Sequence, residues 1–571
     1  MPNIEIRLNP FVYISETDIR FYLLILTAVL LPVFWIFFYG FTIVTFESDI
    51  FELESRYLLR FFIIAVLASV FPAVIYWRYS QEPKRIIKKM QLKKLDREKY
   101  PEECQSIDKI LTETSVNNRI IWMYHPFDPS ESAFTFGTTE VSYICLSGGL
   151  LTRTFTDDIE SFKSIIRHEL GHIINGDVPK AYLAVSASQI LLTLIILPVA
   201  MIAAFGVLVV LGTIHGEGFT LLVSAVKPSS LLTYLNVLLY FLIFLTIIYL
   251  LRNQIIRVRE FYADARVYDW GFSDNLIITL KKYTGLKSQF DILGKFHPEP
   301  EKRIEALKNN SGLFAQNLLV AFTAGFFYNL FPFFIFSLII DYIFVGFFTH
   351  PDYGLRQVFG LVFIIDLISI TFLMVAISST FHRTLLKDIF TNHHRFFSLA
   401  TVTDAITFSL TFGLGVQMSV LLTGVIIVLT TNIDRMEENL MGIFLNIIPY
   451  ATSMFISLFF LMIFASLSIQ TSYSKKDAMK NFFLFTCLSS ILYIFNDLIA
   501  AHLFYNQLLG VVFFLFFSLI ACVIIMNMRR NLHCPHCNEK LNNQNPLELS
   551  CPKCKKRLFS WAIYASLLNS V

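Results

Sequence analysis

The segment RHELGHIINGD, from Arg167 to Asp177, contains the residue types of a hydrolytic zinc site. His168 and His172 are four residues apart, so on a helix their imidazoles lie one turn apart on one face and can bind the same tetrahedral Zn²⁺. Glu169 would then lie beside the metal without binding it, where a general base must lie to take a proton from attacking water. The alternative for a bare HExxH pattern is a surface helix with two solvated histidines.

A second segment, REFYADAR from Arg259 to Arg266, offers the ligand that this site still needs. A catalytic zinc site has three protein ligands and an open fourth position. Glu260 is the predicted third ligand, and Asp264, one helical turn later, is predicted to accept the second ring N–H of a ligating histidine. The alternative is a solvated acidic face on a helix rich in arginine.

Local patterns predict the elements that hold these residues. The stretch from Asp157 to Asn175 has helical periodicity, begins with acidic residues and is followed by Gly176, a residue typical of helix ends. The stretch from Ser132 to Leu151 mixes β-branched and aromatic residues with glycines and predicts two short strands. We expect a soluble domain of mixed α and β structure, formed by two inserts between apolar segments.

The composition places most of the remaining chain in a lipid bilayer. Hydrophobic residues make up 55% of the 571 residues and charged residues only 16%, unlike a soluble globular protein. A transmembrane helix needs about 20 largely apolar residues. Ten apolar runs meet this requirement, at 21–46, 57–77, 182–212, 230–251, 316–346, 357–379, 402–430, 441–469, 481–504 and 507–527.

The distribution of basic residues predicts how these runs are oriented. Lys and Arg are concentrated after the second run, from Arg78 to Lys99, and again at 252–266, 383–395, 475–480 and after Arg529. Because basic residues favour cytoplasmic loops, we expect the catalytic domain and both termini on the cytoplasmic side of the bacterial inner membrane. The first run is followed by Glu47 and Asp49 rather than a small-residue cleavage site, so we expect it to be retained.

With these motifs in order, residues from about 80 to 310 resemble the integral-membrane metallopeptidases that include HtpX and the CAAX prenyl proteases. The resemblance rests on SAFTFG with LSGGLL, then RHELGHIINGD, then REFYADARV, then FHPEPEKRIEAL. It implies that Glu260 is the third ligand and that His297 and Arg303 stabilise the oxyanion or hold the substrate, although both residues could instead have structural roles. It also implies a substrate strand beside Ser132, Ala133 and Phe134, where Ser132 replaces an asparagine common in relatives.

Four cysteines near the carboxyl end predict a second zinc site. Cys534 and Cys537 form one CxxC pair, and Cys551 and Cys554 form another after thirteen residues. Four thiolates close the coordination shell, so this ribbon is predicted to be structural and to lie in a reducing compartment. A thiol redox role is the alternative.

The six apolar runs after residue 313 exceed the four-span arrangement of HtpX-like relatives. Asp341, Asp366, Asp404 and Asp497 lie within or near them, either on a proton or ion path or bonded to neighbouring helices. The predicted division of the chain is a membrane hairpin at 1–79, the protease domain at 80–181 and 252–312 around a hairpin at 182–251, a six-helix membrane domain at 313–528 and the ribbon at 529–571.

Together these patterns predict a mainly α membrane-embedded zinc metalloendopeptidase. Its partners would be polypeptide or membrane-protein substrates and the lipid bilayer, with no nucleic acid expected. Quality control of membrane proteins and processing of a specific substrate are both compatible with the sequence. An alternative function is a transporter or membrane scaffold with a protease-like regulatory domain.

Overall fold

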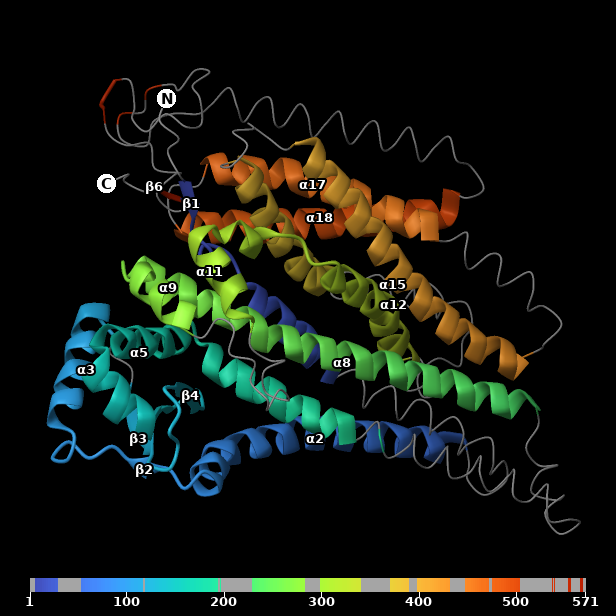
Figure 1. Cartoon of the computed structure of the whole chain (residues 1–571). Helices are drawn as coiled ribbons and strands as arrows, with labels where there is room; N and C mark the ends of the chain where they lie inside the picture. The colour runs from blue at the N-terminus through green and yellow to red at the C-terminus, as the bar shows by residue number, and fades with distance from the viewer. Residues whose placement is uncertain are drawn as a thin grey trace, which may run out of the picture.

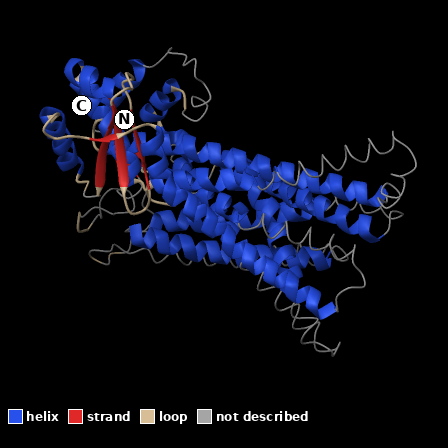
Figure 2. Cartoon of the chain, turned by 90° about the horizontal axis from the view of Figure 1, so that it is seen from below, coloured by secondary structure: helices blue, strands red, loops and turns tan. Residues whose placement is uncertain are grey.

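The computed structural model describes residues 6–28, 53–116, 119–193, 196, 228–282, 298–339, 370–389, 398–431, 447–471, 475–503, 537, 539, 553–555 and 565–567. These residues are mainly helical. They include a small sheet at one end of the molecule, and the long helices extend from this end (Figure 1, Figure 2). His297, Cys534 and Cys551 lie outside the described residues, so the predictions that rest on them stay predictions.

The four-stranded sheet has the order β2-β3-β5-β4 and lies in the catalytic part of the chain. Its strands are β2 (Lys93–Lys94), β3 (Ile120–His125), β4 (Ala133–Gly137) and β5 (Ser142–Ser147). β3 and β5 are parallel, whereas β4 pairs with β5 antiparallel. The two strands expected between Ser132 and Leu151 are thus β4 and β5, and β4 is an edge of the sheet.

Helix α5 (Ile159–Ile174) contains the HExxH segment and packs on this sheet, beside α3 (Pro101–Thr114). Asp158 caps α5 by accepting a hydrogen bond from the Ser161 backbone N–H at 3.1 Å. Beyond the end of the helix, Gly176 has a φ of +66°, the left-handed conformation in which glycine is favoured. The apolar face of α5, formed by Phe162, Ile166 and Leu170, is fully buried and packs with residues of β5. This helix corresponds to the one predicted from Asp157 to Asn175.

Helix α8 (Pro228–Asp269) connects the apolar part of the molecule with the catalytic part. Its first half is apolar and its last turns lie beside α5 (Figure 1). Two shorter helices, α9 (Ser273–Lys282) and α11 (Pro300–Lys308), pack on these last turns. Pro300 is at the start of α11, where a missing backbone N–H costs no hydrogen bond.

The later helices form a bundle beside α8 (Figure 1). They are α12 (Leu318–Ile339), residues 370–389, α15 (Leu399–Thr431), α17 (Ile447–Thr471) and α18 (Lys475–Leu503). Glycines allow α12 and α15 to approach closely, since a Cβ on Gly325 would lie 2.1 Å from the Phe412 carbonyl oxygen and one on Gly415 2.3 Å from that of Phe322. Small residues at such crossings are typical of helices packed in membranes.

The amino-terminal segment contacts both the catalytic part, through the ion pair of Asp18 with Lys180, and the bundle, through the bond from the Ser379 hydroxyl to the Ile14 carbonyl oxygen. β1 (Ile6–Leu8) pairs with β6 (Ala565–Leu567) from the other end of the chain. The helical residues 16–28 follow, and Ile19 and Leu23 are buried in the large core that also contains residues of α8, α12 and α15. Segments far apart in sequence therefore share one core.

Two described helices are long and apolar enough to cross a membrane, Phe241–Asp269 and Leu399–Val420. A third candidate is the bent pair Pro300–Lys308 and Gly312–Tyr328, and Tyr450–Ser466 and Ala478–Tyr493 are shorter apolar helices. This count within the described residues is lower than the ten predicted spans. Helix α2 (Leu53–Lys89) also includes the predicted run 57–77, whereas the predicted runs 182–212, 357–379 and 507–527 extend beyond the described residues or lie outside them.

Candidate metal centre

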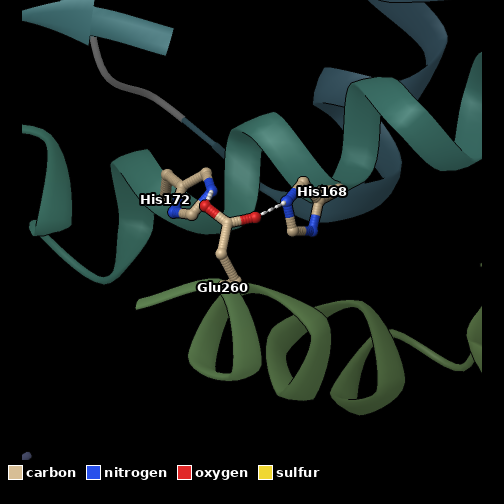
Figure 3. Close-up of side chains that lie close together, drawn as sticks. All are labelled: His168, His172 and Glu260. Atoms are coloured by element: carbon tan, nitrogen blue, oxygen red, sulfur yellow. Dashed lines mark hydrogen bonds and ion pairs between the residues drawn. The ribbon is translucent and has the colours of Figure 1, made fainter. Parts of the chain in front are cut away.

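Helices α5 and α8 bring His168, His172 and Glu260 together (Figure 3). His168 Nε2 lies 3.3 Å from Glu260 Oε2, and His172 Nε2 lies 3.5 Å from Glu260 Oε1. One ligand atom from each residue can be chosen so that all lie within 4.8 Å of one another. All three side chains are buried. Two imidazole nitrogens and a carboxylate oxygen in this arrangement fit a catalytic Zn²⁺, so the convergence of these two helices is confirmed.

A glycine on α5 permits this convergence. Gly171 lies next to His172, and a Cβ at this position would be 3.0 Å from the Ala263 carbonyl oxygen and 3.2 Å from Ala263 Cα on α8. Ala263 itself is fully buried and presents only a methyl group. The two ligand-bearing helices are therefore packed backbone to backbone beside the metal ligands.

Asp264 contacts His168 on the side away from Glu260. Its Oδ1 lies 2.9 Å from His168 Nδ1, so a proton on Nδ1 can be donated to the carboxylate while Nε2 faces the metal position. Such a bond fixes the tautomer and the orientation of a ligating imidazole. This is the contact predicted for Asp264.

Arg303 enters the same cluster from α11. Its Nε and Nη2 donate to Oδ2 and Oδ1 of Asp264 at 2.8 Å and 2.6 Å, a bidentate pair, and its Nη1 lies 3.7 Å from Glu260 Oε2. The structure thus places Arg303 beside the ligands, supporting Asp264. Its role toward the oxyanion or the substrate stays a prediction, as does that of His297.

Asp177 faces the second histidine, and the sequence patterns had assigned it no role. Its Oδ2 lies 3.7 Å from His172 Nδ1, and its side chain is buried. The turn at Gly176 ends α5 and is followed at once by the helical residues 177–193, so Asp177 lies directly after the turn. The signal available in the sequence was an acidic residue five positions after a ligating histidine.

The carboxylates around the histidines favour positive charge at this site. Burial lowers the pKa of His172, but Glu260 and Asp177 outweigh burial and raise it to about 9. Burial and Arg303 lower the pKa of His168, whereas Asp264 and Glu260 raise it, and the net shift is upward. The same negative potential stabilises a divalent cation bound to these imidazoles.

Glu169 lies on the same helix and is not one of the three clustered ligands. It is buried, and its Oε2 accepts a hydrogen bond from the Thr135 hydroxyl of β4 at 2.5 Å. Of the residues predicted to border the substrate, Ala133 and Phe134 lie in edge strand β4, and Ser132 directly precedes it, where its N–H donates to Ser147 Oγ at 3.1 Å. The structure therefore places the predicted base next to the predicted substrate strand.

Comparison with protein families supports the same assignment. Residues 106–311 match peptidase family M48, a range that contains His168, His172 and Glu260. Comparisons with curated proteins and with solved structures gave no match. The chain therefore contains a zinc metallopeptidase domain of family M48, and this domain is joined to helices long and apolar enough to cross a membrane.

Proposed function

We propose that this protein is an endopeptidase that cleaves polypeptides at the cytoplasmic face of a membrane, with Glu169 as the general base. The observation that carries the proposal is the meeting of His168, His172 and Glu260 from two separate helices. Zinc bound there would lower the pKa of water and polarise the scissile carbonyl. Glu169 is adjacent to a ligand, buried and outside the ligand set, which is the position that proton transfer from the attacking water requires.

Replacing Glu169 by Gln tests this role. The purified full-length chain carrying Glu169→Gln should keep its zinc and lose cleavage of an unfolded polypeptide by at least about a hundredfold, because general base catalysis contributes about 10²–10⁴. Glu160→Gln is a matched control on the same helix, since the Glu160 side chain is 52% exposed and pairs with Lys163. Undiminished turnover in Glu169→Gln would refute the assignment.

The edge position of β4 supports substrate binding by strand addition. β5 occupies one side of β4, and α5 lies against it. An extended peptide beside Ser132, Ala133 and Phe134 would exchange main-chain hydrogen bonds with this edge, close to the metal ligands. Peptide substrates that each carry one N-methylated amide test this mode. Methylation should weaken binding only at every second position, because only alternate residues of a strand exchange hydrogen bonds with the same neighbouring strand. Equal loss at every position would contradict this mode.

For the rest of the chain we propose the ten spans, the division into domains and the cytoplasmic placement that the sequence predicts. The ribbon of Cys534, Cys537, Cys551 and Cys554 would hold a second zinc, supported by the paired CxxC spacing. The full chain should then bind two zinc ions. A variant carrying both Cys551→Ser and Cys554→Ser should bind one and keep the catalytic site occupied, whereas two ions in this variant would exclude the ribbon.

Quality control of membrane proteins is the cellular role that we favour over processing of one substrate, because the predicted topology resembles that of a bacterial membrane protein. The test compares the proteins that accumulate in cells carrying the active form with those in cells carrying Glu169→Gln. A broad set of accumulating proteins would indicate quality control, and a single protein would indicate specific processing. A transporter or scaffold with a regulatory protease-like domain is the alternative. It would be favoured if a chain ending before Asn317 kept full metal-dependent proteolysis, because the later helices would then have a separate function.

A further inference from the structure

Thr135 lies in the middle of edge strand β4 and contacts the predicted base directly. Its hydroxyl donates to Glu169 Oε2 at 2.5 Å and lies 3.3 Å from the Glu169 carbonyl oxygen. Thr135 and Glu169 are only 6% and 7% exposed. Water therefore has little access to these two side chains and cannot readily replace the hydrogen bond between them.

The fold fixes the direction of the Thr135 side chain. Neighbouring residues of a strand point to opposite faces. Phe134 and Phe136 pack in the cluster that also contains Ile86 and Ile87 from α2, so Thr135 faces the other way, toward α5. Pairing of Thr135 with Ile144 on β5 and stacking of Phe136 on Tyr143 at 4.9 Å hold this register.

From this geometry we infer that Thr135 is a positioning residue for Glu169, an inference that rests on the proposed role of Glu169 as general base. The terminal torsion of a glutamate is broad, so a carboxylate without a partner samples many orientations. A hydrogen bond to Oε2 restricts this torsion and leaves the second oxygen to take the proton. A bond of this kind to a charged group contributes enough to change a rate about tenfold or more.

The position of Thr135 also links substrate binding with the orientation of the general base. It lies on the strand proposed to pair with the substrate, one residue after Phe134. A single rigid strand therefore determines both where the peptide backbone lies and where the carboxylate of Glu169 points. Misplacement of a catalytic group by about 1 Å can lower a rate by about a hundredfold, so loss of the Thr135 hydroxyl should lower kcat rather than weaken substrate binding.

The test uses the full-length zinc-loaded protein and three substitutions. Thr135→Val keeps the shape and removes the hydroxyl, and kcat should fall about tenfold while KM and zinc content stay within about twofold. Thr135→Ser restores a hydroxyl and should recover kcat to within about threefold of the unchanged protein. Thr135→Ala also removes the hydroxyl and must show the same loss in kcat, which covers the case in which the valine variant fails to fold.

A matched control and a double substitution separate positioning from general damage. Thr114→Val alters another buried threonine, whose hydroxyl donates to the Ile110 carbonyl oxygen within α3, and should leave kcat unchanged. In a Glu169→Gln background, Thr135→Val should lower the residual rate no further.

Full kcat in Thr135→Val, or no recovery in Thr135→Ser, would overturn the inference. Full turnover in Glu169→Gln would instead overturn the proposed general base, whatever the result at Thr135.

Discussion

Adding one methyl group at Gly171 should separate the metal ligands without unfolding the protein. The new Cβ in Gly171→Ala would lie 3.0 Å from the Ala263 carbonyl oxygen and 3.4 Å from Ala263 Cβ. Ordinary contacts of this kind begin near 3.4 Å, so α5 and α8 must move apart by about 0.4 Å. Zinc sites tolerate errors in ligand distance of only about 0.2 Å, and here the histidines and Glu260 come from different helices.

The cost of this substitution should appear in the affinity for zinc. Overpacking typically costs about 1–3 kcal/mol, but the metal-free protein can relieve the strain by letting the helices separate. Zinc binding forces them together again, so its dissociation constant should rise by about tenfold to a hundredfold. Folding stability should change little, since alanine is favoured over glycine in a helix by about 1 kcal/mol.

Competition with a chelating dye measures this affinity, and circular dichroism reports the helix content. Gly312→Ala is the matched control, because a Cβ there meets no atom within 4 Å. Unchanged zinc affinity in Gly171→Ala would refute the claim that close approach of α5 and α8 sets the geometry of the site.

Other substitutions separate the roles of the surrounding residues. Asp264→Asn should weaken zinc binding by about 10–100-fold in the same competition assay, since it weakens support of His168 and leaves Arg303 facing a neutral partner. Asp177→Asn should weaken it by less than about tenfold, because the contact with His172 is longer, 3.7 Å. Gly325→Ala should lower the unfolding temperature, measured by thermal unfolding in detergent, because the new Cβ would lie 2.1 Å from the Phe412 carbonyl oxygen.

The metal ligands could be predicted from the sequence because their arrangement is set by local periodicity. Residues four apart on a helix share a face whatever the rest of the chain does. That rule paired His168 with His172 and Glu260 with Asp264. Predicting that the two helices lie side by side required only one further assumption, that a catalytic zinc site needs a third ligand.

Thr135 and Asp177 were not predicted because their contacts depend on how separate elements meet. The sequence indicated a strand near Ser132 but not which of its faces lies against α5. A polar Thr135 between two phenylalanines was an available signal for a strand with one apolar face and one functional face. Asp177 acquires its contact through the turn at Gly176, whose direction a helical pattern does not specify.

Hydropathy predicted the apolar segments but not the polar contacts that join them. Arg383 was assigned to a basic stretch from the distribution of charge, with no contact predicted for it, and the structure buries this residue at 2% exposure. Its guanidinium lies 5.4 Å from the Tyr262 ring centre and donates to the Leu313 carbonyl oxygen. A long-range contact of this kind leaves no periodic pattern in the sequence.

The contacts around Tyr262 connect the additional helices with the zinc site. Tyr262 lies two residues after Glu260 on α8, and its hydroxyl oxygen accepts a hydrogen bond from the Glu16 backbone N–H at 3.3 Å. Arg383, from a helix that follows the family match, lies 3.9 Å from a Glu16 carboxylate oxygen. A chain ending before Asn317 would lose Arg383 and expose the buried face of α8 that holds Tyr262. We therefore expect the truncated protein to bind zinc more weakly than the full chain, since α8 must keep its place for Glu260 to reach both histidines.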